Sequence, residues 1–78
     1  MAASAYHRGM MYNAEYVRRD GDRLVVIDRS NSEHPSFIEA MVVAKAVFTP
    51  FKLRGAQGVI VYENGGPEVG RWFETDDA

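Results

Sequence analysis

The most distinct hydrophobic pattern in this chain is a helical one, in residues 35–51 (PSFIEAMVVAKAVFTPF). At about 100° per residue, one face of this helix collects Phe37, Ala40, Met41, Ala44, Val47 and Phe48. We expect this face to pack on a sheet, because its two alanines permit close approach. Ser36, followed three residues later by Glu39, is typical of a capping box, and alternatively Pro35 is the first helical residue. Pro50 is expected to mark the end, because the residue before a proline is pushed out of the helical region.

The opposite face of the same helix is also apolar. It carries Ile38, Val42, Val43 and Ala46, and only Glu39 and Lys45 are charged there. A helix that is apolar on both sides is usually covered on both sides. Two coverings remain open: a loop or the N-terminal segment of this chain, or else a protein partner or a second copy of the chain. For the second case we expect an interface centred on Ile38 and Val42, with Lys45 at its rim.

Two stretches before the helix, residues 12–19 and 23–29, have the composition of β-strands. Asp20-Gly21 between them predicts a hairpin with a type I′ turn, which needs positive φ at both central residues. That turn places Tyr16 opposite Val25, Ala14 opposite Ile27, Arg18 opposite Arg23 and Val17 opposite Leu24. The face that holds Tyr12, Tyr16, Val25 and Ile27 is expected to be the core side, and a slip of one residue would invert it.

After the helix, residues 49–57 are expected to form a loop, with Phe51 and Leu53 beneath it and Gly55 at a turn. Strands are predicted at 58–63 and 68–75, with a turn at residues 64–67 (NGGP). A four-residue turn pairs Val59 with Trp72 and Val61 with Gly70, so the Trp72 ring would cover the gap at the glycine.

The element order is therefore β-β-α-β-β. Two hairpins and one helix can bury a core by joining into one antiparallel four-stranded sheet with the helix on one face. The sequence thus predicts an α+β two-layer sandwich. We expect one domain at 11–75, a flexible N-terminal segment at 1–10 and an acidic tail at 76–78. Met10 and Met11 are alternative starts, which would make the preceding residues a leader.

Composition limits the classes of function. The chain has 78 residues and no cysteine, which excludes disulfides, thiol chemistry and cysteine-bound zinc. The absence of cysteine also favours a cytoplasmic location. No apolar run approaches the roughly 20 residues that span a bilayer. The net charge of −2 predicts no general attraction to nucleic acid or to anionic membranes.

Groups suited to catalysis are few in the sequence. The serines fall in expected loops or at the helix cap, and His7 and His34 are the only histidines, with His34 expected to be an exposed loop residue. A nucleophile needs a base and an orienting group beside it. Asp20 and Asp22 flank a turn glycine but lack the spacing of a calcium-binding loop. We therefore expect no enzyme activity, no cofactor and no metal site.

Arginine is more frequent than lysine, seven against two. Four arginines cluster on the first hairpin, namely Arg18, Arg19, Arg23 and Arg29. The planar guanidinium suits carboxylate, phosphate and interface contacts. Acidic residues lie among these arginines, so a surface of ion pairs is the leading interpretation. The alternative is a small nucleic-acid-binding accessory protein that uses this hairpin, with aromatic residues stacked on bases.

The pattern as a whole resembles small phage-encoded anti-CRISPR proteins. The resemblance lies in the strand with Tyr12 and Tyr16, the helix with Ala40 and Ala44-Lys45, the strand Val59-Ile60-Val61-Tyr62 and the closing Arg71-Trp72, over residues 11–73. It is also similar to uncharacterised small bacterial proteins with the same element order. The resemblance implies an inhibitor without catalytic groups that covers a surface of a bacterial nucleoprotein defence complex. It assigns no functional residue. The leading hypothesis is therefore a protein-interaction module, with a homodimer as a further possibility.

Overall fold

The computed structural model describes residues 11–30 and 32–77. The expected flexible segment 1–10 lies outside the described residues, as does Ala78 of the expected tail. The described elements are β1 (Tyr12–Asp20), β2 (Arg23–Arg29), α2 (Phe37–Ala46), α3 (Phe48–Leu53), β3 (Gly58–Glu63), β4 (Glu68–Phe73) and the 3₁₀ helix η1 (Glu74–Asp77).

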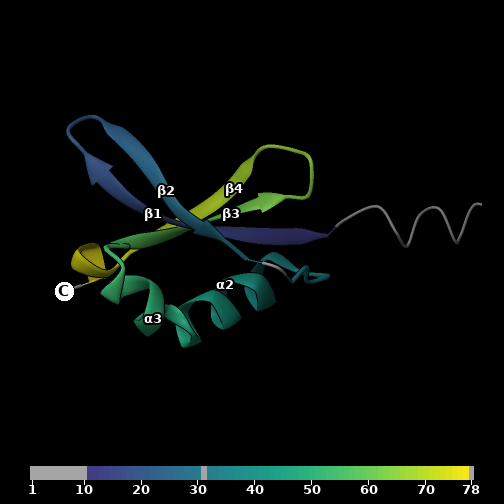
Figure 1. Ribbon diagram of the computed structural model, residues 1–78. Coiled ribbons are helices and arrows are strands. Elements are labelled where there is room, and N and C mark those ends of the chain that lie inside the picture. Colours follow the sequence, from purple (N-terminus) through teal and green to yellow (C-terminus); the bar gives the residue numbers. More distant parts are fainter. Residues whose placement is uncertain (1–10, 31, 78) are drawn as a thin grey trace, which may run out of the picture.

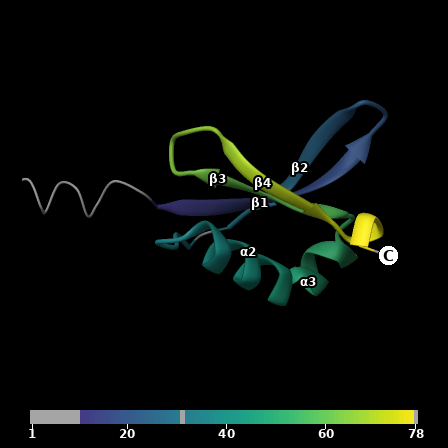
Figure 2. The ribbon, with the colours of Figure 1, turned by 180° about the vertical axis from the view of Figure 1, so that it is seen from behind.

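The four strands form one antiparallel sheet in the order β2-β1-β3-β4. Both α-helices lie on one side of it, and the turn ends of the two hairpins diverge away from the helices (Figures 1 and 2). This arrangement confirms the predicted α+β architecture, with the difference that the helical layer contains two helices.

The first hairpin forms, but with a different turn from the one predicted. Asp20 pairs with Arg23, so the turn residues are Gly21 and Asp22. Gly21 has a φ of 66°, and no described residue other than a glycine has a positive φ. Positive φ at the first central residue alone is the pattern of a type II′ turn. The type I′ prediction was wrong because a glycine at the first central position of a hairpin turn favours type II′.

The change of turn moves the strand pairing by two residues. Val17 lies opposite Val26, and Arg18 lies opposite Val25. A shift by an even number leaves the side chains of residues 17–26 on their predicted faces. A bulge between Tyr16 and Val17 then sets Tyr16 opposite Asp28, and Ile27 packs against the core as expected.

The start of α2 agrees with the predicted cap. The Ser36 hydroxyl accepts a hydrogen bond from the Glu39 backbone N–H at 3.0 Å, so Pro35 is not the first helical residue. Only half of the capping box forms, because the Glu39 carboxylate bonds to His34 Nδ1 at 2.9 Å.

The predicted end of the helix was wrong. α2 ends at Ala46, and after Val47 the short helix α3 begins. Pro50 lies in the first turn of α3, where its missing N–H costs no intrahelical hydrogen bond. Residues 49–53 of the expected loop are therefore helical, whereas Gly55 does lie at a turn, with a φ of 107°.

The break at Val47 redirects the side chains that follow. Val47 is 46% exposed and Leu53 is 83% exposed, so neither belongs to the core, contrary to the sequence interpretation. Phe48 is buried, and Phe51 stacks on Tyr16 with ring centroids 3.8 Å apart. The predicted helix ran through Val47 without a break, whereas the chain turns at this residue.

The main core lies between the helices and the sheet. Its buried members are Ala14, Tyr16, Ala40, Ala44, Phe48, Ala56, Val59 and Val61. A second buried cluster of Val17, Ile60 and Phe73 lies apart from it.

The second hairpin contains the two predicted pairs, Val59 opposite Trp72 and Val61 opposite Gly70, and a register shift after Val61 then sets Tyr62 opposite Glu68. The ring that covers Gly70 belongs to Phe37, because a Cβ at Gly70 would lie 2.6 Å from two of its atoms. Trp72 meets the edge of Phe48 instead, at 5.2 Å between centroids. β4 ends at Phe73, two residues earlier than expected.

Candidate functional site

Ile38 and Val42 form an exposed apolar strip on the outer face of α2, called the outer strip below. Ile38 is 70% exposed and Val42 is 60% exposed, one helical turn apart. Ala40 and Ala44, on the opposite face, are buried against the sheet. Within the part of the chain that the structure describes, nothing covers the outer strip.

Charged groups flank the outer strip at its two ends. Glu39, which lies in the first turn of α2, bonds to His34. Lys45 lies in the last turn, with its ammonium nitrogen 4.9 Å from the centre of the Trp72 ring. An ammonium over an indole face is attracted by the ring quadrupole. The structure therefore places Lys45 beside the edge strand β4, at the border between the helical layer and the sheet.

The helical layer exposes two further apolar side chains, Val47 and Leu53. The sequence had predicted both of them to be buried. Pro50 was the available signal. A helix continued through position 50 would lose a hydrogen bond there, whereas a new helix begun at Phe48 would not. A break just before Phe48 was therefore the alternative to an end at Pro50.

The four arginines of the first hairpin do not form one patch. Arg18 and Arg19 are neighbours on β1 and point to opposite faces. The Arg19 guanidinium lies 3.7 Å from the centre of the Phe73 ring, and Arg29 Nε bonds to Glu15 Oε2 at 2.7 Å. Arg23 is exposed opposite Asp20 beside the turn.

Two further arginines, Arg54 and Arg71, are held in ion pairs with carboxylates of the sheet. Arg54 bonds to Asp28 at 2.7 Å, and Arg71 holds both carboxylate oxygens of Glu68 at 2.7 Å each. The hydrogen bond from Arg54, assisted by the Arg29 backbone N–H, lowers the pKa of Asp28. The hydrogen bond from Arg71 likewise lowers the pKa of Glu68. These pairs compete with any phosphate for the guanidinium groups.

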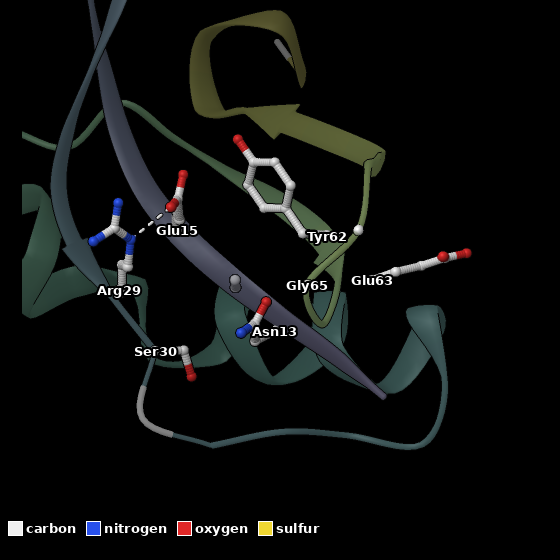
Figure 3. Close-up of a pocket in the computed structure, with 9 residues that line it drawn as sticks. Asn13, Glu15, Arg29, Ser30, Tyr62, Glu63 and Gly65 are labelled. Atoms are coloured by element: carbon white, nitrogen blue, oxygen red, sulfur yellow. Dashed lines mark hydrogen bonds and ion pairs between the residues drawn. The ribbon is translucent and has the colours of Figure 1, made fainter. Parts of the chain in front are cut away.

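A hollow of about 220 Å³ lies beside β1, between the end of β2 and the β3–β4 turn (Figure 3). Its lining includes Asn13, Glu15, Arg29, Ser30 and Tyr62. Figure 3 shows Glu15 between Arg29 and the Tyr62 ring. Burial, with the Glu15 charge as a further cause, raises the pKa of the Tyr62 phenol.

A chain of polar side chains leads from the edge of this hollow to the start of α2. Ser30 Oγ lies 3.2 Å from Ser32 Oγ, Ser32 Oγ lies 3.2 Å from His34 Nε2, and His34 Nδ1 lies 2.9 Å from Glu39 Oε2. The His34 side chain is only 15% exposed, so the expectation of an exposed loop residue was wrong. The sequence reasoning missed this group because the capping-box pattern assigned Glu39 to the helix cap.

Nowhere in 11–30 or 32–77 do three histidine or acidic side chains gather as a metal site requires. None of the helices in these ranges is long and apolar enough to cross a membrane.

Comparison of the chain with models of protein families, with curated proteins and with solved structures found no match.

Proposed function

We propose that this chain is a protein-interaction module that binds its partner through the outer strip. The observation that carries the proposal is the exposure of Ile38 and Val42 on a helix whose opposite face is already used by the core. Exposed aliphatic side chains stacked at i and i+4 lose water favourably when a second surface covers them. A small apolar centre with charged groups around it has the anatomy of a protein interface.

The resemblance in element order to small anti-CRISPR proteins suggests which partner to test first. We propose a bacterial nucleoprotein defence complex as this partner, with this chain acting as an inhibitor that covers part of its surface. A second copy of the chain is the other occupant that the test must separate.

The double variant Ile38→Glu, Val42→Glu tests the surface. Both side chains point away from the sheet, so the variant should unfold at nearly the wild-type temperature. Two buried carboxylates at an interface would be strongly unfavourable, so we expect partner capture to fall at least tenfold. Capture is measured by pull-down from nuclease-treated bacterial lysate, and self-association by sedimentation velocity.

Leu53→Glu is the matched control, since it places a charge at an exposed aliphatic position of α3 outside the outer strip. It should bind as the wild type does. A double variant that stays folded and still captures the same partner in the same amount would move the interface elsewhere, and an exposed sheet edge would be the next surface to test.

A further inference from the structure

We propose that Ser32, His34 and Glu39 form a nucleophile, base and carboxylate arrangement that reacts with small activated carboxylic esters. The proposal goes beyond partner binding and does not depend on it. It rests on the two distances that join the three side chains, 3.2 Å from Ser32 Oγ to His34 Nε2 and 2.9 Å from His34 Nδ1 to Glu39 Oε2. A serine within reach of a histidine that a carboxylate orients is the signature of an activated hydroxyl nucleophile.

The hydrogen bonds assign the histidine tautomer that this chemistry needs. A carboxylate accepts and does not donate, so His34 Nδ1 carries the proton and donates it to Glu39. In the neutral imidazole, His34 Nε2 is then the acceptor for the Ser32 hydroxyl. The 3.2 Å from Ser32 Oγ to His34 Nε2 is at the upper end of the range over which a general base takes a proton.

The backbone holds the base in place and leaves the nucleophile accessible. His34 exchanges two backbone hydrogen bonds with Tyr12, at 2.8 and 2.9 Å, which ties it to the start of β1. Glu39 is fixed within the first turn of α2, where its own N–H is bonded to Ser36. Ser32 is exposed to solvent. The rigid elements thus position the histidine and the carboxylate, and the serine stands where an ester can reach it.

The surroundings of Ser32 indicate the size of the substrate. Ser30, whose hydroxyl lies 3.2 Å from Ser32 Oγ, also lines the hollow of about 220 Å³. Sites for drug-sized ligands are larger, at about 300–1,000 Å³. The hollow therefore suits a short acyl group.

The reaction balances without a cofactor. Ser32 Oγ attacks the ester carbonyl carbon, His34 Nε2 takes the hydroxyl proton, and the bond to the leaving oxygen breaks. The leaving group takes the proton from His34, and an acyl-serine remains. Water, deprotonated by His34, then attacks the acyl carbon, the bond from that carbon to Ser32 Oγ breaks, and Ser32 Oγ takes the proton back from His34. The products are one carboxylic acid and one alcohol, and the serine is regenerated.

The test uses p-nitrophenyl acetate and a fluorophosphonate on the full chain, with intact mass and peptide mapping as readouts. We expect one label per chain, at Ser32. Ser32→Ala should lose it, and the matched variant Ser4→Ala, which changes a serine outside the proposed site, should keep it. His34→Ala should slow labelling about 10²-fold, and added imidazole should restore part of the rate.

Glu39 is a positioning residue, so the test of its role must separate its effect on labelling from its effect on the stability of α2. Glu39→Gln should slow labelling, and Glu39→Asp, which keeps the carboxylate, should label faster than Glu39→Gln. The thermal midpoints of the two variants, followed by circular dichroism, should be similar. Label spread over several residues, or an unchanged rate in Ser32→Ala or in Glu39→Gln, would overturn the proposal. Labelling and partner capture are separate measurements on the same protein, so failure of this proposal and failure of the partner proposal are distinguishable.

Discussion

Single glycines control the shape of the sheet at particular points. Gly70 leaves room for the Phe37 ring, and Gly58 leaves room for the Trp72 carbonyl oxygen, which would lie 2.5 Å from a Cβ at position 58. Gly21 acts differently, because nothing lies within 4 Å of where its Cβ would be. Its importance is its backbone conformation, with a φ of 66° in the first hairpin turn.

Gly21→Val should therefore lower the free energy of unfolding without creating a clash. A β-branched residue at positive φ is strained, at a cost of about 1–3 kcal/mol. Chemical denaturation is the measurement. Gly21→Ala is the control and should cost less, since alanine is not branched at Cβ. Equal stability of the valine variant and the wild type would mean that the turn does not need the left-handed conformation.

At the scale of the elements, the break between α2 and α3 separates two neighbours that helical periodicity had grouped together. Phe48 is buried against Tyr16 and Trp72, with ring centroids at 6.4 and 5.2 Å. Val47 caps both helices and is half exposed. The break thus allows α3 to press Phe48 and Phe51 onto the core.

This difference predicts opposite results for two adjacent substitutions. Phe48→Ala should destabilise the chain by about 3–5 kcal/mol, because it removes a buried ring and leaves a cavity. Val47→Ala should cost less than about 1 kcal/mol, since much of that side chain already contacts water. Denaturant melts of the two variants decide the matter. Similar losses would indicate that one continuous helix carries both residues into the core.

At the scale of the whole molecule, the positive charges are dispersed rather than gathered on one surface. Arg29, Arg54 and Arg71 are held by carboxylates. Arg18 and Arg23 make no ion pair with any side chain in the described ranges, and they lie on the same side of the first hairpin with Asp20 between them.

If the nucleic-acid alternative is right, these two residues should carry it. Arg18→Gln with Arg23→Gln should then abolish retention on a nucleic-acid column and the dependence of retention on salt. The paired arginines provide the control, Arg54→Gln with Arg71→Gln, which should change retention little. Absence of wild-type retention at low salt would eliminate this alternative.

The sequence by itself determined the elements whose signals are local. Alternation and turn residues located four strands, the Ser36 cap located the start of α2, and the pairs Val59–Trp72 and Val61–Gly70 followed from the length of one turn. The exposure of Ile38 and Val42 also followed, because helical geometry alone sets which residues share a face.

Tertiary structure decided what depends on contacts between distant segments. The strand order β2-β1-β3-β4, the bulge at Tyr16 and the exposure of Val47 each reflect packing that no local pattern encodes. The approach of Ser32, His34 and Glu39 is of the same kind. It requires the hydrogen bonds that hold His34 against Tyr12, 22 positions earlier in the chain, since these set the imidazole between the loop and the first turn of α2.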